Sequence, residues 1–287
     1  MENFVKYLTP GKEDKSWGLY LNVAGTVVSL PNTEYPQKNH PAGYYFTWEK
    51  GRVLQEYQIN YISEGSGILE TNSGKYTLKP GNLFILRPGM KHRYRPLKKT
   101  GWHENYIGFN GEFADHILDG EWFNPSSPVI YCGYKEELID TYMKIFDLVS
   151  EEKPGYQQIV SGLVIKLIGY IISAEKQKEF KGKDISKFIE EVRFRMREEI
   201  DQTLDLKKMT HDHLIGYSYF RKMFKKYTGV APHQYNLELK IMRSKELLLS
   251  TNKSVKEISF ELGFQSIYYF SRLFKNKTGI SPSAFRR

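Results

Sequence analysis

The sequence FRKMFKKYTGVAPHQY at residues 220–235 returns, at a constant offset, as FSRLFKNKTGISPSAF at residues 270–285. The two copies share two phenylalanines, a lysine, a Thr-Gly pair and a proline at equivalent positions. Upstream, Leu206 and Met209 match Val255 and Ile258 one residue out of step, which predicts one extra turn residue in the second copy. A duplicated basic segment anchored by phenylalanine predicts a pair of helices that contact DNA.

Each copy has the apolar spacing of an amphipathic helix. In the first copy the inward positions are Phe220, Met223, Phe224 and Tyr227, and the outward positions are Ser218, Arg221, Lys222 and Lys225. In the second copy the inward positions are Phe270, Leu273 and Phe274, and the outward positions are Tyr268, Ser271, Arg272 and Lys275. Exposed long donors and hydroxyl groups suit base edges in a major groove. A solvated surface explains any single Arg or Lys equally well, so the prediction depends on the matched pair.

The ends of the copies and the charge distribution agree with this interpretation. Thr-Gly ends each helix, and the proline that follows suits the first turn of the next one. The helix between the copies, residues 233–249, is expected to hold them roughly 34 Å apart, one helical repeat of DNA. Of the net charge of +9, residues 181–287 carry 22 Lys and Arg against 12 Asp and Glu, whereas residues 1–180 carry 20 against 21. Localised positive charge favours a polyanionic partner.

The first half of the chain has a different pattern. Up to about residue 131, short runs rich in Tyr, Val, Ile and Phe alternate with turn residues and predict an antiparallel sandwich or small barrel. The clearest runs are residues 56–63, 67–71, 75–79 and 82–86. Residues 134–180 then show two helical apolar stripes. Packing on the barrel explains both, although the second stripe is wide enough for a subunit interface as well.

Other features concern the cellular compartment. The lone cysteine, Cys132, is typical of a reducing cytoplasm, and the first residues lack the apolar core of a secretory signal. The longest apolar stretch, residues 159–172, contains Ser, Gly and Lys and is too short to span a bilayer. A cytoplasmic protein with no membrane partner is expected.

The motifs VKEISFELGF (255–264), YFSRLFK (269–275) and TGISP (278–282) resemble the signature of the arabinose-regulator (AraC/XylS) family of bacterial transcription factors. The resemblance covers residues 184–287 and implies two helix-turn-helix units joined by a long helix, which enter successive major grooves. The family's base-contacting positions fall here on Tyr217, Ser218, Arg221 and Lys222, and on Ile267, Tyr268, Ser271 and Arg272. Two residues depart from the pattern: His213 stands at an apolar core position, and Gly216 replaces the usual capping Ser.

Residues 57–67 and 88–94 resemble the cupin barrel of sugar-sensing members of the same family, a resemblance that covers about residues 20–125. It implies an effector site, and the implied ligand-binding residues are Arg52, His92, Tyr94, Glu104 and Tyr106. Glu104 stands where the family's pocket has His, so the identity of the sugar does not transfer. Barrel packing explains the two tyrosines equally well, and a surface charge explains Arg52 and Glu104 equally well. Trp48 and Trp102 are expected in the core, and His40 in a loop.

Metal chemistry is disfavoured. Metal-dependent cupins place a His-x-His pair, a Glu and a later His around the ion, because a metal needs convergent N and O ligands. Here His92 is followed by Arg93 and Tyr94, and the N-terminal half contains no His-x-His. We therefore expect neither a metal nor another cofactor, and no enzymatic activity.

The sequence thus predicts an α+β chain with two domains. The expected parts are a cupin-like barrel (1–132), a helical dimerisation segment (133–180), a linker (181–183) and a double helix-turn-helix domain (184–287). The expected function is sequence-specific transcription regulation, as an activator, by a homodimer that binds double-stranded DNA, a sugar effector and RNA polymerase. Two alternatives stay open: a metal-dependent cupin enzyme fused to a basic DNA-binding module, and an architectural protein that binds DNA without sequence preference.

Overall fold

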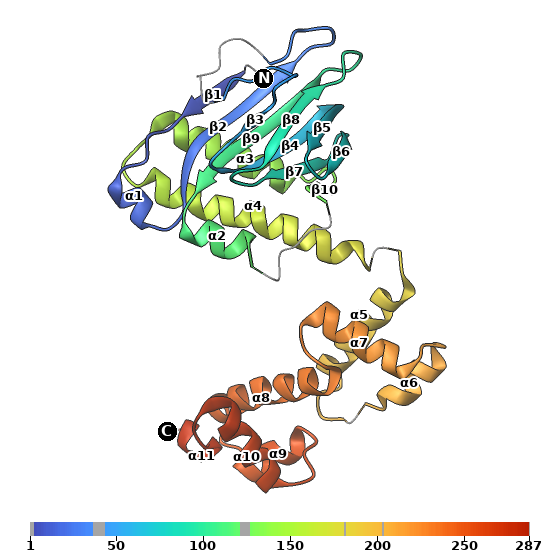
Figure 1. The fold of residues 1–287 in the computed structure, drawn as a ribbon. Helices are drawn as coiled ribbons and strands as arrows, with labels where there is room; N and C mark the ends of the chain where they lie inside the picture. Colours follow the sequence, from blue (N-terminus) through green and yellow to red (C-terminus); the bar gives the residue numbers. More distant parts are fainter. Residues whose placement is uncertain (1–2, 37–43, 121–126, 181, 203, 287) are drawn as a thin grey trace. The chain divides into compact units, whose positions relative to one another are not determined.

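The computed structural model describes residues 3–36, 44–120, 127–180, 182–202 and 204–286. The chain divides into two compact units, Met1–Lys178 and Glu179–Arg287. The first is built on β-sheet and the second on helices (Figure 1), which confirms the predicted fold class. His40 and the first residue of the expected linker at 181–183 lie outside the described residues.

Ten described strands form two antiparallel sheets in the N-terminal unit. The six-stranded sheet has the order β1-β2-β9-β4-β7-β10, and the four-stranded sheet has the order β3-β8-β5-β6. The strands are β1 (Phe4–Tyr7), β2 (Tyr20–Ser29), β3 (Arg52–Val53), β4 (Tyr57–Gly65), β5 (Gly67–Thr71), β6 (Gly74–Leu78), β7 (Asn82–Leu86), β8 (Lys91–Pro96), β9 (Trp102–Asn110) and β10 (Val129–Tyr131). The strands predicted at 67–71 and 82–86 have the observed bounds, whereas those at 56–63 and 75–79 differ by one or two residues at their ends.

The central strand β4 is buried from Tyr57 to Ser63, so both of its faces are covered. Because side chains alternate along a strand, Tyr57, Ile59 and Tyr61 lie on one face, in a core that extends to the helices. The residues between them face the second sheet, where Ile62 joins Phe84, Tyr94 and Trp102 in a separate apolar cluster. The space between the two sheets is therefore apolar around Ile62. Nearer the start of β4 it contains the buried polar side chains of Gln58 and Asn60.

All but the first of the described helices of this unit pack on the outer face of the larger sheet (Figure 1), and the first buries none of its residues. They are α1 (Lys12–Ser16), α2 (Glu112–Leu118), α3 (Glu136–Glu151) and α4 (Tyr156–Lys178). Among the described helices, α4 alone is long and apolar enough to cross a membrane by length and composition. Its residues Val160, Val164 and Leu167 are instead fully buried in the core that α4 shares with the sheet. Ile159 on the same helix is 57% exposed, so the predicted subunit interface on this helix stays a prediction.

The C-terminal unit consists of seven described helices. They are α5 (Asp184–Glu198), α6 (Leu206–Asp212), α7 (Tyr217–Thr228), α8 (Pro232–Ser250), α9 (Val255–Glu261), α10 (Ile267–Thr278) and α11 (Pro282–Phe285). Both α7 and α10 end at a Thr followed by a glycine with a left-handed backbone, and proline begins the next helix in each case. The two repeats therefore fold alike, as the sequence predicts.

The seven helices enclose two apolar cores, and α8 contributes to both. Phe188, Phe220 and Phe224 lie in the first core, and Phe270 and Phe274 lie in the second. On α8, Tyr235 and Leu239 pack against the first core, whereas Leu237, Ile241 and Leu248 belong to the second. Figure 1 shows α8 running from the group α5–α7 to the group α9–α11. One helix is thus a wall of both cores.

Candidate DNA-recognition helices and effector cavity

The first recognition helix is α7, which follows the short helix α6. Asp205 caps α6 by accepting hydrogen bonds from the backbone N–H groups of Lys207 and Lys208, each at 3.0 Å. Phe220 and Phe224 bury one face of α7 completely. The expected base-contacting residues lie on the other side: Ser218, Arg221, Lys222 and Lys225 are exposed, and Tyr217 is half-buried.

The second recognition helix, α10, is held in the same way and is capped better. The Ser266 hydroxyl accepts a hydrogen bond from the Tyr269 N–H at 3.4 Å, and a reciprocal capping box joins Ser254 to Glu257 at the start of α9. Phe270 and Phe274 are fully buried. Of the expected contact residues, Tyr268, Arg272 and Lys275 are exposed, and Ile267 and Ser271 are half-buried.

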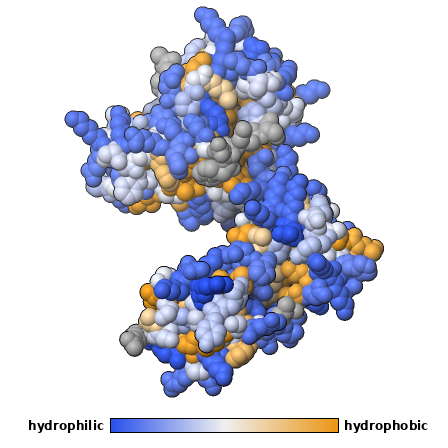
Figure 2. All heavy atoms as spheres, turned by 60° about the horizontal axis from the view of Figure 1, so that its bottom comes forward, coloured by the Kyte–Doolittle hydropathy of each residue, from blue (hydrophilic) through white to orange (hydrophobic). Residues whose placement is uncertain are grey.

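The cations of the two recognition helices fall into two groups, those that form ion pairs within the protein and those that do not. Lys226 at the end of α7 lies 2.5 Å from Glu179, and Lys277 at the end of α10 lies 3.1 Å from Glu238. Within the described ranges, the expected contact residues form no ion pair: these are Arg221, Lys222, Lys225, Arg272 and Lys275. On the face drawn in Figure 2, hydrophilic side chains cover most of both units. These cations are therefore available to phosphates and base edges.

The register of the repeat changes at one residue. The N–H of Ile215 donates to the carbonyl of Thr210, and the N–H of Phe264 donates to the carbonyl of Ser259. These matched bonds align the first helix and turn of each unit. The second unit then has an additional residue, Gln265, before its capping Ser266, whereas Gly216 follows Ile215 directly. This is the extra turn residue that the sequence predicts.

The effector cavity lies inside the N-terminal unit. It has a volume of about 30 Å³, and its lining includes four of the five implied ligand residues, Arg52, Tyr94, Glu104 and Tyr106. Gly25 faces Tyr106 across the β2–β9 pair, and a Cβ atom at Gly25 would lie 2.7 Å from the Tyr106 ring. The absence of a side chain on β2 thus lets Tyr106 occupy its place. The remaining walls are Tyr7, Val27, Tyr35, Pro36, Tyr44, Phe46 and Gln58.

Arg52 is the cation of this cavity. Its guanidinium donates hydrogen bonds to the Tyr94 hydroxyl at 2.7 Å, to the Tyr44 carbonyl at 2.5 Å and to His92 Nε2 at 3.1 Å. It also lies over the rings of Phe46 and Tyr94, 5.1 and 5.2 Å from their centroids. The side chain is therefore fixed by both polar and aromatic contacts.

His92 supports Arg52 and lies outside the cavity lining. Burial, and then the nearby Arg52 cation, lower the pKa of His92 to about 4, so the ring is neutral. With Nδ1 donating to the Met90 carbonyl at 2.8 Å, Nε2 is free to accept from Arg52. His92 thus contacts Arg52 and does not line the cavity, and its implied role in effector binding stays a prediction.

Two carboxyl groups are buried beside the cation. Burial raises the pKa of Glu104 to about 8, although Arg52 opposes this shift, and Glu104 Oε1 has no hydrogen-bond partner among the described residues. Glu56 is buried as well, and burial raises its pKa. Its oxygens accept hydrogen bonds from the Tyr44 hydroxyl at 3.0 Å and from the Gln58 amide at 2.9 Å. Glu56 is thus satisfied, whereas Glu104 is not.

Further polar atoms near Glu104 lack partners. Gln58 Oε1 and both side-chain polar atoms of Asn60 are buried without a hydrogen bond among the described residues. Gln58 and Asn60 lie on the face of β4 that also carries Ile62, between the two sheets. Leaving such groups unpaired costs about 1–3 kcal/mol each, so they favour a polar ligand in this interior. The sequence analysis did not select Gln58, Asn60, Tyr44 or Glu56.

The two tryptophans of this unit that were expected in its core lie in different surroundings. Trp102 is buried in the apolar cluster, as expected. Trp48 is only partly buried, because it stacks against Arg93 and Arg95 at the surface, so its expected core position is wrong. In the described part of the chain, no three His, Cys, Asp or Glu side chains come together in a way that could hold a metal ion.

Comparison with known protein families identifies both units. A model described as a helix-turn-helix domain matches residues 214–287, and a model described as an AraC-like ligand binding domain matches residues 32–168. The Msm operon regulatory protein of Streptococcus mutans is 26% identical over 240 residues, which cover 82% of this chain and 85% of that protein.

Two further relatives have similar coverage. The MmsAB operon regulatory protein of Pseudomonas aeruginosa is 27% identical over 237 residues, or 81% of this chain and 75% of that protein. The arabinose operon regulatory protein of Escherichia coli is 22% identical over 240 residues, or 81% of each chain. All three similarities extend across both the ligand-binding and the helix-turn-helix parts.

Proposed function

Because this chain is an AraC-family transcription regulator with a ligand-binding domain and a helix-turn-helix domain, we propose that a small polyhydroxylated effector in its barrel controls how its two recognition helices engage an operator. The observation that supports DNA binding is the pair of exposed basic helices, each packed through two phenylalanines on its own core. Each helix offers hydroxyl groups and cations that form no ion pair with any described residue, and such side chains contact base edges and phosphates. The expected base contacts are Tyr217, Ser218, Arg221, Lys222, Lys225, Ile267, Tyr268, Ser271, Arg272 and Lys275.

In vitro selection from a random duplex library tests this half. The full-length protein is expected to enrich two short half-sites about 10 base pairs apart, one for each recognition helix. Enrichment of no sequence, with equal salt dependence on selected and random duplexes, would favour an architectural protein instead.

The observation that carries the effector half is the group of buried polar atoms beside Arg52. A neutral Glu104 can donate one hydrogen bond and accept others, and Gln58, which also lines the cavity, offers a further acceptor. Aromatic walls suit the C–H faces of a sugar. The arabinose operon regulatory protein is named for a sugar operon, and we assign this chain a sugar effector on the same grounds.

The cavity size implies a change on binding. A volume of about 30 Å³ is about that of one water molecule, so a sugar requires the walls to separate. Three of these walls, Tyr35, Tyr44 and Phe46, belong to the segment between β2 and β3. Effector binding therefore moves this segment, and the ligand can distinguish two states of the protein.

A thermal-shift screen against pentoses, hexoses and short oligosaccharides tests the effector site. A bound sugar stabilises the folded protein by mass action, by roughly 2–3 kcal/mol when its concentration is a hundredfold above Kd. The melting temperature of the full-length protein should rise accordingly. Arg52→Met is expected to abolish the shift, and Lys79→Met, an exposed cation on the same unit, to preserve it. A shift that survives Arg52→Met would place the sugar elsewhere.

Glu104 also gives the barrel a pH dependence. The folded unit holds the proton up to about pH 8, whereas the unfolded chain releases it near pH 4.5, so the stability contributed by Glu104 falls as pH rises between these values. Glu104→Gln is expected to melt at a higher temperature than the wild type at about pH 8 and at a similar temperature at about pH 5. Equal melting temperatures at both values would show that Glu104 is ionised in the folded state.

The remaining roles follow from the same assignment. We place dimerisation on α3 and α4, because Ile159 and Ile165 are large apolar side chains that α4 leaves exposed. We further propose a cytoplasmic activator that contacts RNA polymerase and has no catalytic activity. A metal analysis of the purified protein separates this from a cupin enzyme, since stoichiometric metal would favour the enzyme.

A further inference from the structure

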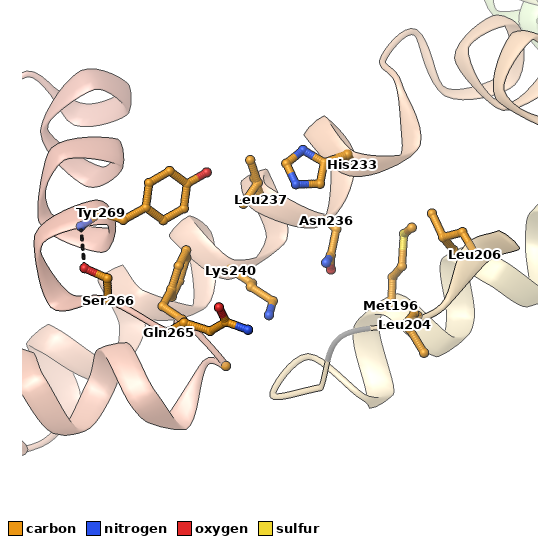
Figure 3. Close-up of a pocket in the computed structure, with 12 residues that line it drawn as sticks. Met196, Leu204, Leu206, His233, Asn236, Leu237, Lys240, Gln265, Ser266 and Tyr269 are labelled. Carbon is orange, nitrogen blue, oxygen red and sulfur yellow. Dashed lines mark hydrogen bonds between the residues drawn. The ribbon is translucent and has the colours of Figure 1, made fainter. Parts of the chain in front are cut away.

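A cavity of about 360 Å³ lies inside the C-terminal unit, between its two helix-turn-helix parts. Figure 3 shows Asn236, Leu237 and Lys240 of α8 between two groups of side chains. Met196, Leu204 and Leu206 stand on one side, and Gln265, Ser266 and Tyr269 stand on the other. Side chains of both parts therefore meet at this cavity, beside the helix α8 that they share.

The backbone of the second turn touches the segment that connects α5 to α6. Gly263 has a φ of +67°, and a Cβ atom built on it would lie 2.1 Å from the carbonyl oxygen of Asp201. No side chain fits between them. Ile200, one residue earlier in the connecting segment, packs against the second core. The segment that leads into the first helix-turn-helix is therefore pressed against the second one.

Lys240 closes this contact from α8. The residue is only 4% exposed, although it is a lysine on a helix of a DNA-binding unit. Its Nζ donates a long hydrogen bond, 3.5 Å, to the carbonyl of Gln202, and lies 3.1 Å from the Cβ position of Gly263. The ammonium group also lies 5.6 Å from the centroid of the Phe264 ring. One cation thus contacts the connecting segment and the second turn together.

Burial of this cation has a cost that points to a role. Desolvation lowers the pKa of Lys240, and Asp201 opposes the shift. Within the described ranges Lys240 forms no ion pair, so the contacts of its charge are the Gln202 carbonyl and the face of the Phe264 ring. A leucine or methionine would cover the same surface without this desolvation. A lysine at this position can link the Gln202 carbonyl to the Phe264 ring, which an apolar side chain cannot do.

The geometry of α8 explains why such bonds matter. A single shared helix fixes the distance between the two cores, but a rotation of one core about the helix is resisted only by packing. A second contact away from the helix axis removes this freedom. The contact formed by Lys240, Gly263 and the carbonyls of Asp201 and Gln202 is such a second point.

We propose that Lys240 is a positioning residue that locks the two recognition helices in one relative orientation and thereby sets the half-site spacing that the protein accepts. This inference rests on the proposed reading of DNA by both helices. Lys240 is not expected to contact DNA itself, because it is only 4% exposed and lies in the wall of the cavity. Its effect is on spacing, and the sequence of each half-site depends on other residues.

In vitro selection with the full-length protein tests this inference. The wild type is expected to enrich two half-sites at one separation, and to lose about tenfold in affinity when one base pair is inserted or removed between them. Lys240→Met is expected to enrich the same half-sites at two or more separations. Lys240→Arg, which keeps the donors, is expected to restore a single separation. Arg243→Met, an exposed cation on α8 that pairs with Glu246, is the matched control and should behave as the wild type.

The outcomes separate the two claims. A wild type that binds duplexes of altered spacing equally well overturns the inference, whether or not any variant folds. A single separation with Lys240→Met overturns it as well, as does a loss of half-site sequence preference in that variant with a folded circular dichroism spectrum. A wild type that enriches no half-sites overturns the proposed function together with the inference.

Discussion

The two helix-turn-helix parts follow nearly the same backbone path with different side chains at the turn. In the second turn, Leu262 is buried, Gly263 occupies the left-handed region and Ser266 caps the recognition helix. In the first turn, His213 replaces the buried leucine and Leu214 has a φ of +55° with a side chain that is 95% exposed. A left-handed leucine costs about 1–2 kcal/mol relative to its ordinary conformation. The residues of the second turn favour its backbone conformation by themselves, whereas the conformation of the first turn depends on contacts with neighbouring helices.

Those surroundings are visible around His213. Its ring lies 4.6 Å from the ring of Phe188, and its Nε2 lies 3.4 Å from Glu191, both on α5. Helix α5 gives the first core an additional wall of Phe188, Ile189 and Val192. The comparison indicates that a turn can keep its backbone path with less favourable residues when a neighbouring helix, here α5, packs against it.

The strongest test of this difference is a methyl group at the second turn. Gly263→Ala places Cβ against the Asp201 carbonyl and forces a left-handed alanine, so we expect a loss of about 3 kcal/mol. Leu214→Ala, the equivalent change in the first turn, should be nearly neutral because that turn already accepts a side chain. Hydrogen exchange of the α9 and α10 amides in the full-length protein measures the loss. Unchanged protection after Gly263→Ala would remove the distinction between the turns.

Base recognition by the two helices is the next test. Arg272→Ala is expected to lower the preference for the selected operator over random duplex by roughly 10- to 100-fold, because an arginine bound to a base edge contributes about 1–3 kcal/mol. Arg221→Ala should cause a similar loss if the first helix contacts bases as strongly. Binding titrations at fixed salt measure both. Lys256→Ala, an exposed charge on α9, is the control, and it should weaken binding to both duplexes alike.

Strain at the first turn gives a smaller and opposite effect. Leu214→Gly is expected to stabilise the first part by about 1 kcal/mol, since the relief of left-handed strain exceeds the entropy cost of glycine. Leu214→Ala keeps the strain and should give no gain. Exchange rates of the α6 and α7 amides report the change. If glycine and alanine behave alike, the strain is not stored at this residue.

The smallest effect concerns the missing cap. Gly216→Ser should stabilise α7 by about 0.3 kcal/mol, and Ser266→Gly should destabilise α10 by a similar amount. Protection of the first-turn amides of each helix is the measurement. A gain much larger than this would mean that the first recognition helix frays in the wild type.

The sequence was sufficient for the features set by local chemistry. The repeated Phe, Thr-Gly and Pro positions predict both recognition helices, and short runs of strand-forming residues between turn residues predict the strands at 67–71 and 82–86. It was insufficient where distant strands meet. Gln58 and Asn60 face the interior only because β4 is covered by helices on one side and by the second sheet on the other. Lys240 looks like a surface cation until the segment from α5 to α6 is placed against it.

The sharing of α8 has a consequence for folding. Because the same helix closes both cores, the melting of either core removes a wall from the other, and the two parts are expected to unfold in a single cooperative transition. Heat or denaturant should therefore yield no species with one folded half. The second core therefore helps to keep the first turn folded, even though the residues of that turn are unfavourable. A mutation that weakens the first turn should lower the stability of the whole unit and should not leave one recognition helix folded without the other.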